Sequence, residues 1–171
     1  MKTATPSMTT WKQPPRIKVY EALGALADGR IKRVIHDGDS DTVIHAQVTS
    51  SKGDKTYTVW FDPSTNTISS NDNGSYWQGY VGYPAIALLC LAGLLIFDED
   101  VAQALSNIPW KELNTQTKND FAKTEKIVLR EYIQTSQGVQ PDQILEEIDS
   151  VMEQLAGLKL FRPAKREIPR K

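Results

Sequence analysis

The chain has 171 residues, a hydrophobic fraction of 40%, a charged fraction of 24% and a formal net charge of −1. A domain of this size buries about 70% of its unfolded surface, so it needs neither disulfides nor a metal to be stable. The charge balance excludes a global field that would draw the protein onto nucleic acid or an anionic membrane, and any such contact requires a local patch. The single cysteine, Cys90, lies among leucines and excludes an internal disulfide, so we expect a reducing, cytoplasmic setting.

The first part of the chain predicts a helix followed by a small sheet. Residues 1–15 are polar and rich in Thr and Pro, and we expect a flexible lead-in without a secretion signal. Apolar residues at helical spacing predict a helix from Arg16 to Asp28, which Gly29 caps. Runs of apolar and polar residues between short turns predict antiparallel strands over residues 31–36, 42–49, 56–61 and 67–70.

The rest of the chain, after the loop 71–82, is expected to be helical. Residues 84–97 carry no charge but are shorter than the roughly 20 residues of a membrane span, so we expect no membrane span here. They predict a buried central helix with Leu88 and Leu91 in the core. Further helices are expected from Asp98 to Leu105, from Thr117 to Thr135, and after Pro141.

Together these elements predict an α+β fold in one domain, residues 16–158. A small antiparallel β-meander packs against the central apolar helix within residues 16–97, and a C-terminal helical segment follows over 98–158. Residues 159–171 are expected to form a basic C-terminal tail.

The sequence offers little for catalysis or metal binding. His36 and His45 are the only histidines, and no cysteine or third histidine is available to complete a zinc site, so we expect no metal and no cofactor. Neither a strand–turn–helix nucleophile motif nor a phosphate-binding glycine loop is present. Asp72 is the best single acid candidate, with Asn71 and Asn73 beside it to orient a substrate.

The loop from Asn71 to Tyr83 is the most unusual segment, because aromatic residues stand among amides and glycines in it. Its aromatic rings could stack on nucleic-acid bases or contact a peptide. They could equally fold back over the sheet while the glycines allow tight turns. The candidate binding residues of this loop are Asn71, Asp72, Asn73, Tyr76, Trp77, Tyr80 and Tyr83.

Basic residues form two groups that are candidates for phosphate contacts. One group, with Arg30 and Arg33, flanks the first predicted strand, and the other, with Lys165 and Arg166, lies in the tail. The acidic helix that precedes the tail could instead hold the tail back.

Residues 16–97 resemble the SWIM zinc-finger domain. Tyr57-Thr58-Val59 matches the Tyr-x-Val of its strand, and an apolar helix follows at the expected place. Ser70, Asp72, Tyr83 and Ala85 fall where that family carries its Cys-x-Cys and Cys-x-His zinc ligands. The resemblance therefore implies a degenerate, zinc-independent domain, in which aromatic packing replaces the metal. It also implies a binding module, because SWIM domains are associated with contacts to DNA, proteins and nucleoproteins.

Our hypothesis from the sequence is a non-enzymatic binding or adaptor protein that contacts nucleic acid or a nucleoprotein through the aromatic loop and the basic tail. One alternative is a small enzyme with its site in loop 71–83, and another is a structural subunit that buries the Trp77 region against a protein partner. A concave pocket with a buried Asp72 would favour the enzyme, and a flat aromatic and basic surface would favour binding.

Overall fold

The computed structural model describes residues 8–35, 38, 42–133, 138–165 and 169. Its elements in chain order are α1 (Ile17–Ala27), β1 (Ile31–Val34), β2 (Ile44–Thr49), β3 (Thr56–Asp62), β4 (Thr67–Ser70), the π-helical turn η1 (Gly74–Gln78), α2 (Tyr83–Leu91), α3 (Glu99–Ala104), α4 (Trp110–Gln116), α5 (Phe121–Ile127), the π-helical turn η2 (Val128–Tyr132) and α6 (Pro141–Gly157). The predicted α+β fold is confirmed.

The sheet has four antiparallel strands in the order β1-β2-β3-β4, as the meander predicts. Ala46 pairs with Val59 and Val48 with Tyr57, so the alternating apolar residues of β2 and β3 share one face. Ala46, Val48 and Val59 are fully or almost fully buried. Side chains on that face form the sheet's half of the core.

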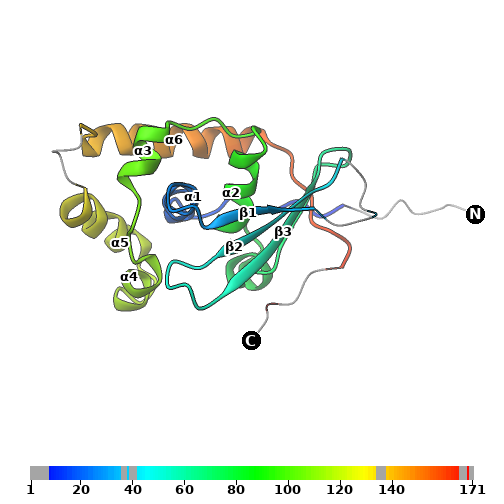
Figure 1. Cartoon of the computed structure of the whole chain (residues 1–171), viewed down its shortest axis with the longest axis horizontal. Helices are drawn as coiled ribbons and strands as arrows, with labels where there is room; N and C mark the ends of the chain where they lie inside the picture. The colour runs from blue at the N-terminus through cyan, green and yellow to red at the C-terminus, as the bar shows by residue number, and fades with distance from the viewer. Residues whose placement is uncertain (1–7, 36–37, 39–41, 134–137, 166–168, 170–171) are drawn as a thin grey trace, which may run out of the picture.

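Helix α2 lies against this sheet, and α1 lies against α2 (Figure 1). Every residue of α2 from Pro84 to Cys90 is buried, which explains why its sequence carries no charge. Around α1 pack α3, α5 and α6, with α6 running along one side of the molecule in Figure 1. Within the described part of the chain, no helix is long and apolar enough to cross a membrane.

The central helix is shorter than predicted. It ends at Leu91, and Gly93 adopts a left-handed conformation with φ of 77°, so the chain reverses there. The prediction that Leu91 lies in the core is wrong, since its side chain is 46% exposed, whereas Leu88 is fully buried.

The helix expected from Thr117 to Thr135 is also wrong at its start. Helix α4, which the sequence did not predict, ends at Gln116, and Lys118 and Asn119 then adopt positive φ angles of 53° and 61°. The Asp120 side chain caps α5 by accepting a hydrogen bond from the backbone N–H of Lys123. Thr135 lies outside the described residues.

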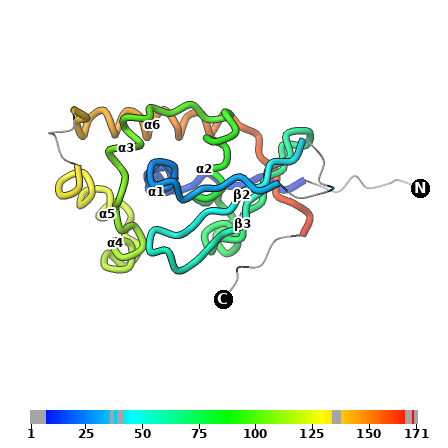
Figure 2. The backbone as a smooth tube through the Cα atoms, viewed as in Figure 1, coloured from blue at the N-terminus to red at the C-terminus, as the bar shows by residue number. Residues whose placement is uncertain are grey.

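The chain ends are less free than predicted. Residues 9–12, expected within a flexible lead-in, pair with residues 160–162 and with residues 79–81, which follow η1 (Figure 2). Trp11 donates from its backbone N–H to the Leu160 carbonyl at 3.1 Å and from its indole N–H to the Ile68 carbonyl at 3.0 Å. The backbone N–H of Ile68 donates to the Phe161 carbonyl, so the first residues of the predicted tail cover the edge of β4.

Candidate functional site

A cavity of about 620 Å³ lies between α1, α4, the hairpin that joins β2 to β3, and the η1 loop. Six aromatic residues contribute to its wall: Tyr57, Trp77, Tyr80, Tyr83, Trp110 and Phe121. Five charged residues do so as well: Lys18, Glu21, Arg30, Lys55 and Lys111. Four of those five charges are positive, so the wall combines aromatic rings with an excess of cations.

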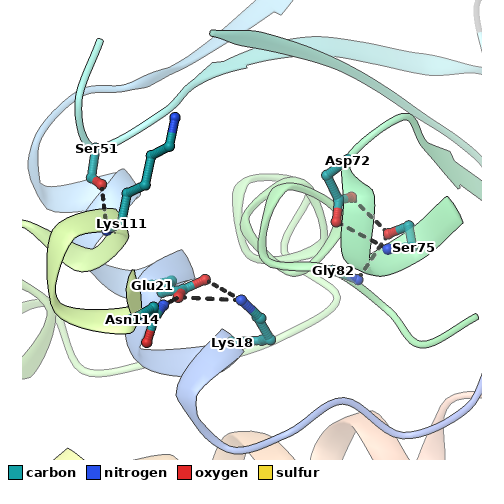
Figure 3. A network of polar contacts seen from close by, with 8 residues as sticks. All are labelled: Lys18, Glu21, Ser51, Asp72, Ser75, Gly82, Lys111 and Asn114. Atoms are coloured by element: carbon teal, nitrogen blue, oxygen red, sulfur yellow. Dashed lines mark hydrogen bonds and ion pairs between the residues drawn. The ribbon is translucent and has the colours of Figure 1, made fainter. Parts of the chain in front are cut away.

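One side of the cavity carries a buried ion pair (Figure 3). The Glu21 side chain accepts from the Lys18 ammonium at 2.9 Å and from the side-chain amide of Asn114. Glu21 is only 4% exposed. Burial alone lowers the pKa of Lys18, but the charge of Glu21 and its hydrogen bond raise that pKa above its ordinary value. Lys18 is therefore a fixed cation, with its ammonium 5.0 Å from the centre of the Phe121 ring.

A second group of cations surrounds the β2–β3 hairpin. Arg30 donates to Asp28 at 3.2 Å and to the Thr49 carbonyl at 2.8 Å. Lys111 donates to Asp54 at 2.9 Å, and the hydrogen bonds from Lys111 and Ser50 lower the pKa of Asp54 to about 2. Neither Asp28 nor Asp54 lines the cavity. The carboxylates thus fix the positions of the cations without lining the cavity themselves.

The cavity wall also carries unmet hydrogen-bonding capacity. Within the described residues, three buried side-chain atoms lack a hydrogen-bond partner in the protein: Arg30 Nη2, Trp110 Nε1 and Asn114 Oδ1. All three residues line the cavity. The Asn114 amide cannot simply be reversed, because its nitrogen donates to the Glu21 carboxylate, which only accepts. Buried polar atoms without a partner are rare in folded proteins, and their concentration here singles out this cavity.

The aromatic rings are held in fixed orientations. Tyr57 and Tyr83 meet edge to face with centroids 6.1 Å apart, and burial raises the pKa of Tyr83, which keeps its phenol neutral. A Cβ at Gly74 would lie 2.7 Å from the Tyr80 ring, so only glycine lets that ring cross the start of η1. Trp77 is 71% exposed and meets Tyr76 edge to face at 4.6 Å. It presents a large apolar surface at the cavity.

Asp72 has a structural role next to the cavity. Its carboxylate accepts from the Ser70 hydroxyl and from the hydroxyl and backbone N–H of Ser75, at 2.7 and 3.0 Å for Ser75. The Ser75 hydroxyl in turn accepts from the backbone N–H of Gly82 at 3.1 Å (Figure 3). The network joins the end of β4, η1 and the start of α2. Asp72 is buried, but it is not part of the cavity wall.

The structure brings together part of the predicted binding set. The cavity wall includes Arg30, Asn73, Trp77, Tyr80 and Tyr83. Asn71 is buried, and its side-chain oxygen accepts from the backbone N–H of Thr58 at 2.8 Å. It therefore links the end of β4 to β3 and does not line the cavity.

The remaining predicted residues lie elsewhere. Tyr76 supports Trp77 from outside the wall, and Arg33 and Lys165 are exposed away from it. Arg166 lies outside the described residues.

Several wall residues were not predicted from the sequence. These are Glu21, Lys55, Tyr57, Trp110, Lys111, Asn114 and Phe121. The only available signal was the Lys18–Glu21 pair, three residues apart in a helix whose other residues are largely apolar.

Other reactive groups are few in the part of the chain that the structure describes. No cluster of three or more His, Cys, Asp or Glu side chains there could hold a metal ion. His36, one of the two histidines considered, lies outside that part. Burial raises the pKa of the Cys90 thiol to about 12, with a smaller contribution from Glu147, which makes it a poor nucleophile.

Comparisons with known proteins give one match. Residues 11–161 match the family described as Uncharacterised conserved protein UCP014422, and this range contains the whole cavity wall. No curated protein and no solved structure matches the chain. Because the match extends over most of its length, the chain belongs to this family of uncharacterised conserved proteins.

Proposed function

We propose that the protein is a non-enzymatic binding protein that takes a short stretch of single-stranded nucleic acid into the cavity between α1, α4 and the sheet. The observation that carries the proposal is the joint presence of aromatic rings and cations around one cavity. Phosphates need cations, and bases need flat apolar surfaces; proteins that bind single strands without sequence preference combine the two.

The aromatic part of this argument centres on Trp77. An indole that is 71% exposed contributes little to folding, and Tyr76 supports it edge to face. Stacking of one base on such a ring is worth about 1–3 kcal/mol. Tyr80 and Tyr83 continue the aromatic surface into the cavity.

The charged part centres on the four cations of the wall. A net charge of −1 for the whole chain gives no general attraction to a polyanion, so attraction requires that cations gather in one place. Lys18, Arg30, Lys55 and Lys111 meet this requirement, and among the described residues Glu21 is the only acid that lines the wall. Lys165 adds exposed positive charge from the basic tail.

The enzyme alternative is less well supported. A pocket with a buried Asp72 is present, as that alternative requires, but the Asp72 carboxylate is engaged with Ser70 and Ser75 and does not reach the wall. Glu21, the acid that does reach it, is held by Lys18 and Asn114. Neither carboxylate is placed to exchange a proton with a substrate.

The resemblance to the SWIM domain points in the same direction, since it implies a binding module. Ser70 and Asp72, two of the positions where that family has ligands, are hydrogen-bonded to each other. That this chain is related to the SWIM family is itself part of our proposal.

Fluorescence anisotropy with short labelled DNA and RNA oligonucleotides at two salt concentrations tests the proposal. Trp77→Ala is expected to weaken binding by about 1–3 kcal/mol without changing the salt dependence, because stacking is not ionic. Ile96→Ala is the matched control, since Ile96 is an equally exposed apolar side chain outside the cavity wall. No binding at low salt by folded protein at tens of micromolar would refute the nucleic-acid proposal, and a protein partner for the Trp77 surface would then be sought.

A further inference from the structure

The hairpin end of the cavity gathers three cations from separate parts of the chain. Arg30 comes from the turn between α1 and β1, Lys55 precedes β3, and Lys111 belongs to the first turn of α4. Backbone and side-chain hydrogen bonds fix their relative places. Arg30 donates to the Thr49 carbonyl, the backbone N–H of Lys55 donates to the Ser50 hydroxyl, and the backbone N–H of Lys111 donates to the Ser51 hydroxyl at 3.1 Å (Figure 3).

These cations keep donors that the protein does not use. Among the described residues, no hydrogen bond or ion pair engages the Lys55 ammonium. The Lys111 ammonium bonds Asp54 and has two further N–H groups. Arg30 uses Nε and Nη1, while its Nη2 has no partner.

The charge balance at this end suits a single phosphate. Asp28 and Asp54 are the carboxylates paired with these three cations, so the group keeps one net positive charge. A phosphodiester, with one negative charge, neutralises it. The Tyr57 and Tyr83 rings, which meet each other edge to face, belong to the same cavity wall.

We propose that Arg30, Lys55 and Lys111 form a phosphate subsite, so that one nucleotide of the bound strand has its phosphate at the hairpin end of the cavity and its base against Tyr57 and Tyr83. This inference rests on the proposed function, and it adds which end of the cavity holds the phosphate. It also gives Asp54 a role as a competitor, because its carboxylate and the phosphate both bind the Lys111 ammonium.

Lys55→Gln tests the subsite directly, with Lys52→Gln as the matched control. Both lysines belong to the same hairpin, but only Lys55 lines the cavity. Binding of inorganic phosphate is followed by NMR titration at constant ionic strength, and competition by phosphate with a labelled oligonucleotide is followed by anisotropy. Loss of one charge-assisted contact is expected to weaken phosphate binding about tenfold in Lys55→Gln and to leave Lys52→Gln unchanged. Equal losses in both variants would overturn the subsite, because they would show only a diffuse field.

Asp54→Asn gives a test that a loss of folding cannot imitate. Removing this carboxylate releases Lys111, so phosphate affinity is expected to rise several-fold, by about the worth of one exposed ion pair. Glu146→Gln removes the same charge from the exposed side of α6 and is expected to have no effect. Unchanged phosphate affinity in Asp54→Asn would contradict the assigned competition and count against the subsite.

The two proposals fail in different ways. Oligonucleotide binding without any response to inorganic phosphate would overturn the subsite and leave the proposed function standing. Phosphate binding that depends on Lys55, without oligonucleotide binding, would overturn the proposed function. In that case the subsite would stand as part of a site for a small phosphorylated molecule.

Discussion

Replacing Gly24 with alanine is expected to destabilise the protein, although alanine is the better helix former. Gly24 lies in α1 where that helix passes the end of α3 and the Trp110 ring. A Cβ at this position would lie 2.9 Å from the Leu105 carbonyl oxygen and 2.9 Å from Trp110 Nε1. Contacts between a Cβ and other heavy atoms are not found at such distances, so either the helices or the indole must move.

The magnitude follows from two opposing contributions. Alanine stabilises a helix interior by about 0.8–1 kcal/mol relative to glycine. Extra volume in a packed core costs about 1–3 kcal/mol. Leu105 and Trp110 are both buried, and one of the two contacts is with backbone, so little relief is available. The two contributions differ by about 0–2 kcal/mol, and because little relief is available we expect a net loss in the upper half of that range, about 1–2 kcal/mol in the free energy of unfolding.

Urea denaturation followed by circular dichroism measures this change. Gly157→Ala is the matched control, because Gly157 is the last residue of α6 and a Cβ there would meet nothing within 4 Å. It is expected to be neutral or to stabilise by up to about 1 kcal/mol. A Gly24→Ala variant as stable as the wild type would refute the close approach of α1 to Leu105 and Trp110. Since Trp110 lines the cavity, oligonucleotide affinity should fall with stability in this variant.

Three further outcomes are expected. Leu88→Ala should cost about 2–5 kcal/mol, whereas Leu91→Ala on the exposed side of the same helix should stay within about 0.5 kcal/mol in the same urea titration. A chelator such as EDTA should leave the melting temperature unchanged, since no cluster of potential metal ligands occurs among the described residues; a drop that zinc restores would contradict this. Hydrogen bonds from Lys111 and Ser50 lower the pKa of Asp54 to about 2, so these contacts stabilise the fold above the unfolded pKa of about 3.9 and lose that effect as the pH falls towards 2. Wild type and Lys111→Met should therefore converge in stability across that acid range, more weakly at high salt.

The elements that the sequence predicted well are those with strong periodicity. Buried and less buried residues alternate along β2 and along β3, because only one face of these strands lies against the core. In α6, Ile144, Ile148 and Val151 recur at helical spacing and are all fully buried. In both cases the burial of one face is visible in the sequence as a regular spacing of apolar residues.

Element boundaries were harder to predict where single residues decide them. The apolar run continues through Leu94, Leu95 and Phe97, and nothing in its hydrophobicity indicates that the helix stops at Leu91. A left-handed Gly93 stops it, and Leu95 then returns to the core from a different direction. Hydrophobicity predicts that a residue is buried and leaves open which element carries it.

The site was predictable only where its residues are neighbours in the chain. Trp77 and Tyr80 stand out because aromatic residues are concentrated in one polar loop. Asn114 and Lys111 reach the cavity from α4, at least 90 residues after Glu21, and no local pattern connects them. Asp72, in the same loop, was predicted as an acid candidate because of its carboxyl group. Its hydrogen bonds with Ser70 and Ser75 give it a structural role instead.

The ion pairs around the cavity also influence how strongly the proposed phosphate ligand is attracted. Lys18, Arg30 and Lys111 each have a carboxylate partner, and each partner offsets part of the attraction for a phosphate. The partners also hold the cations in place, so less side-chain entropy is lost when a ligand binds. Binding of a polyanion to these cations is expected to be strong at low salt and to weaken as the salt concentration rises. On the proposed function we therefore expect a modest affinity, with selectivity that comes from the fit of one ring and one phosphate to the same wall.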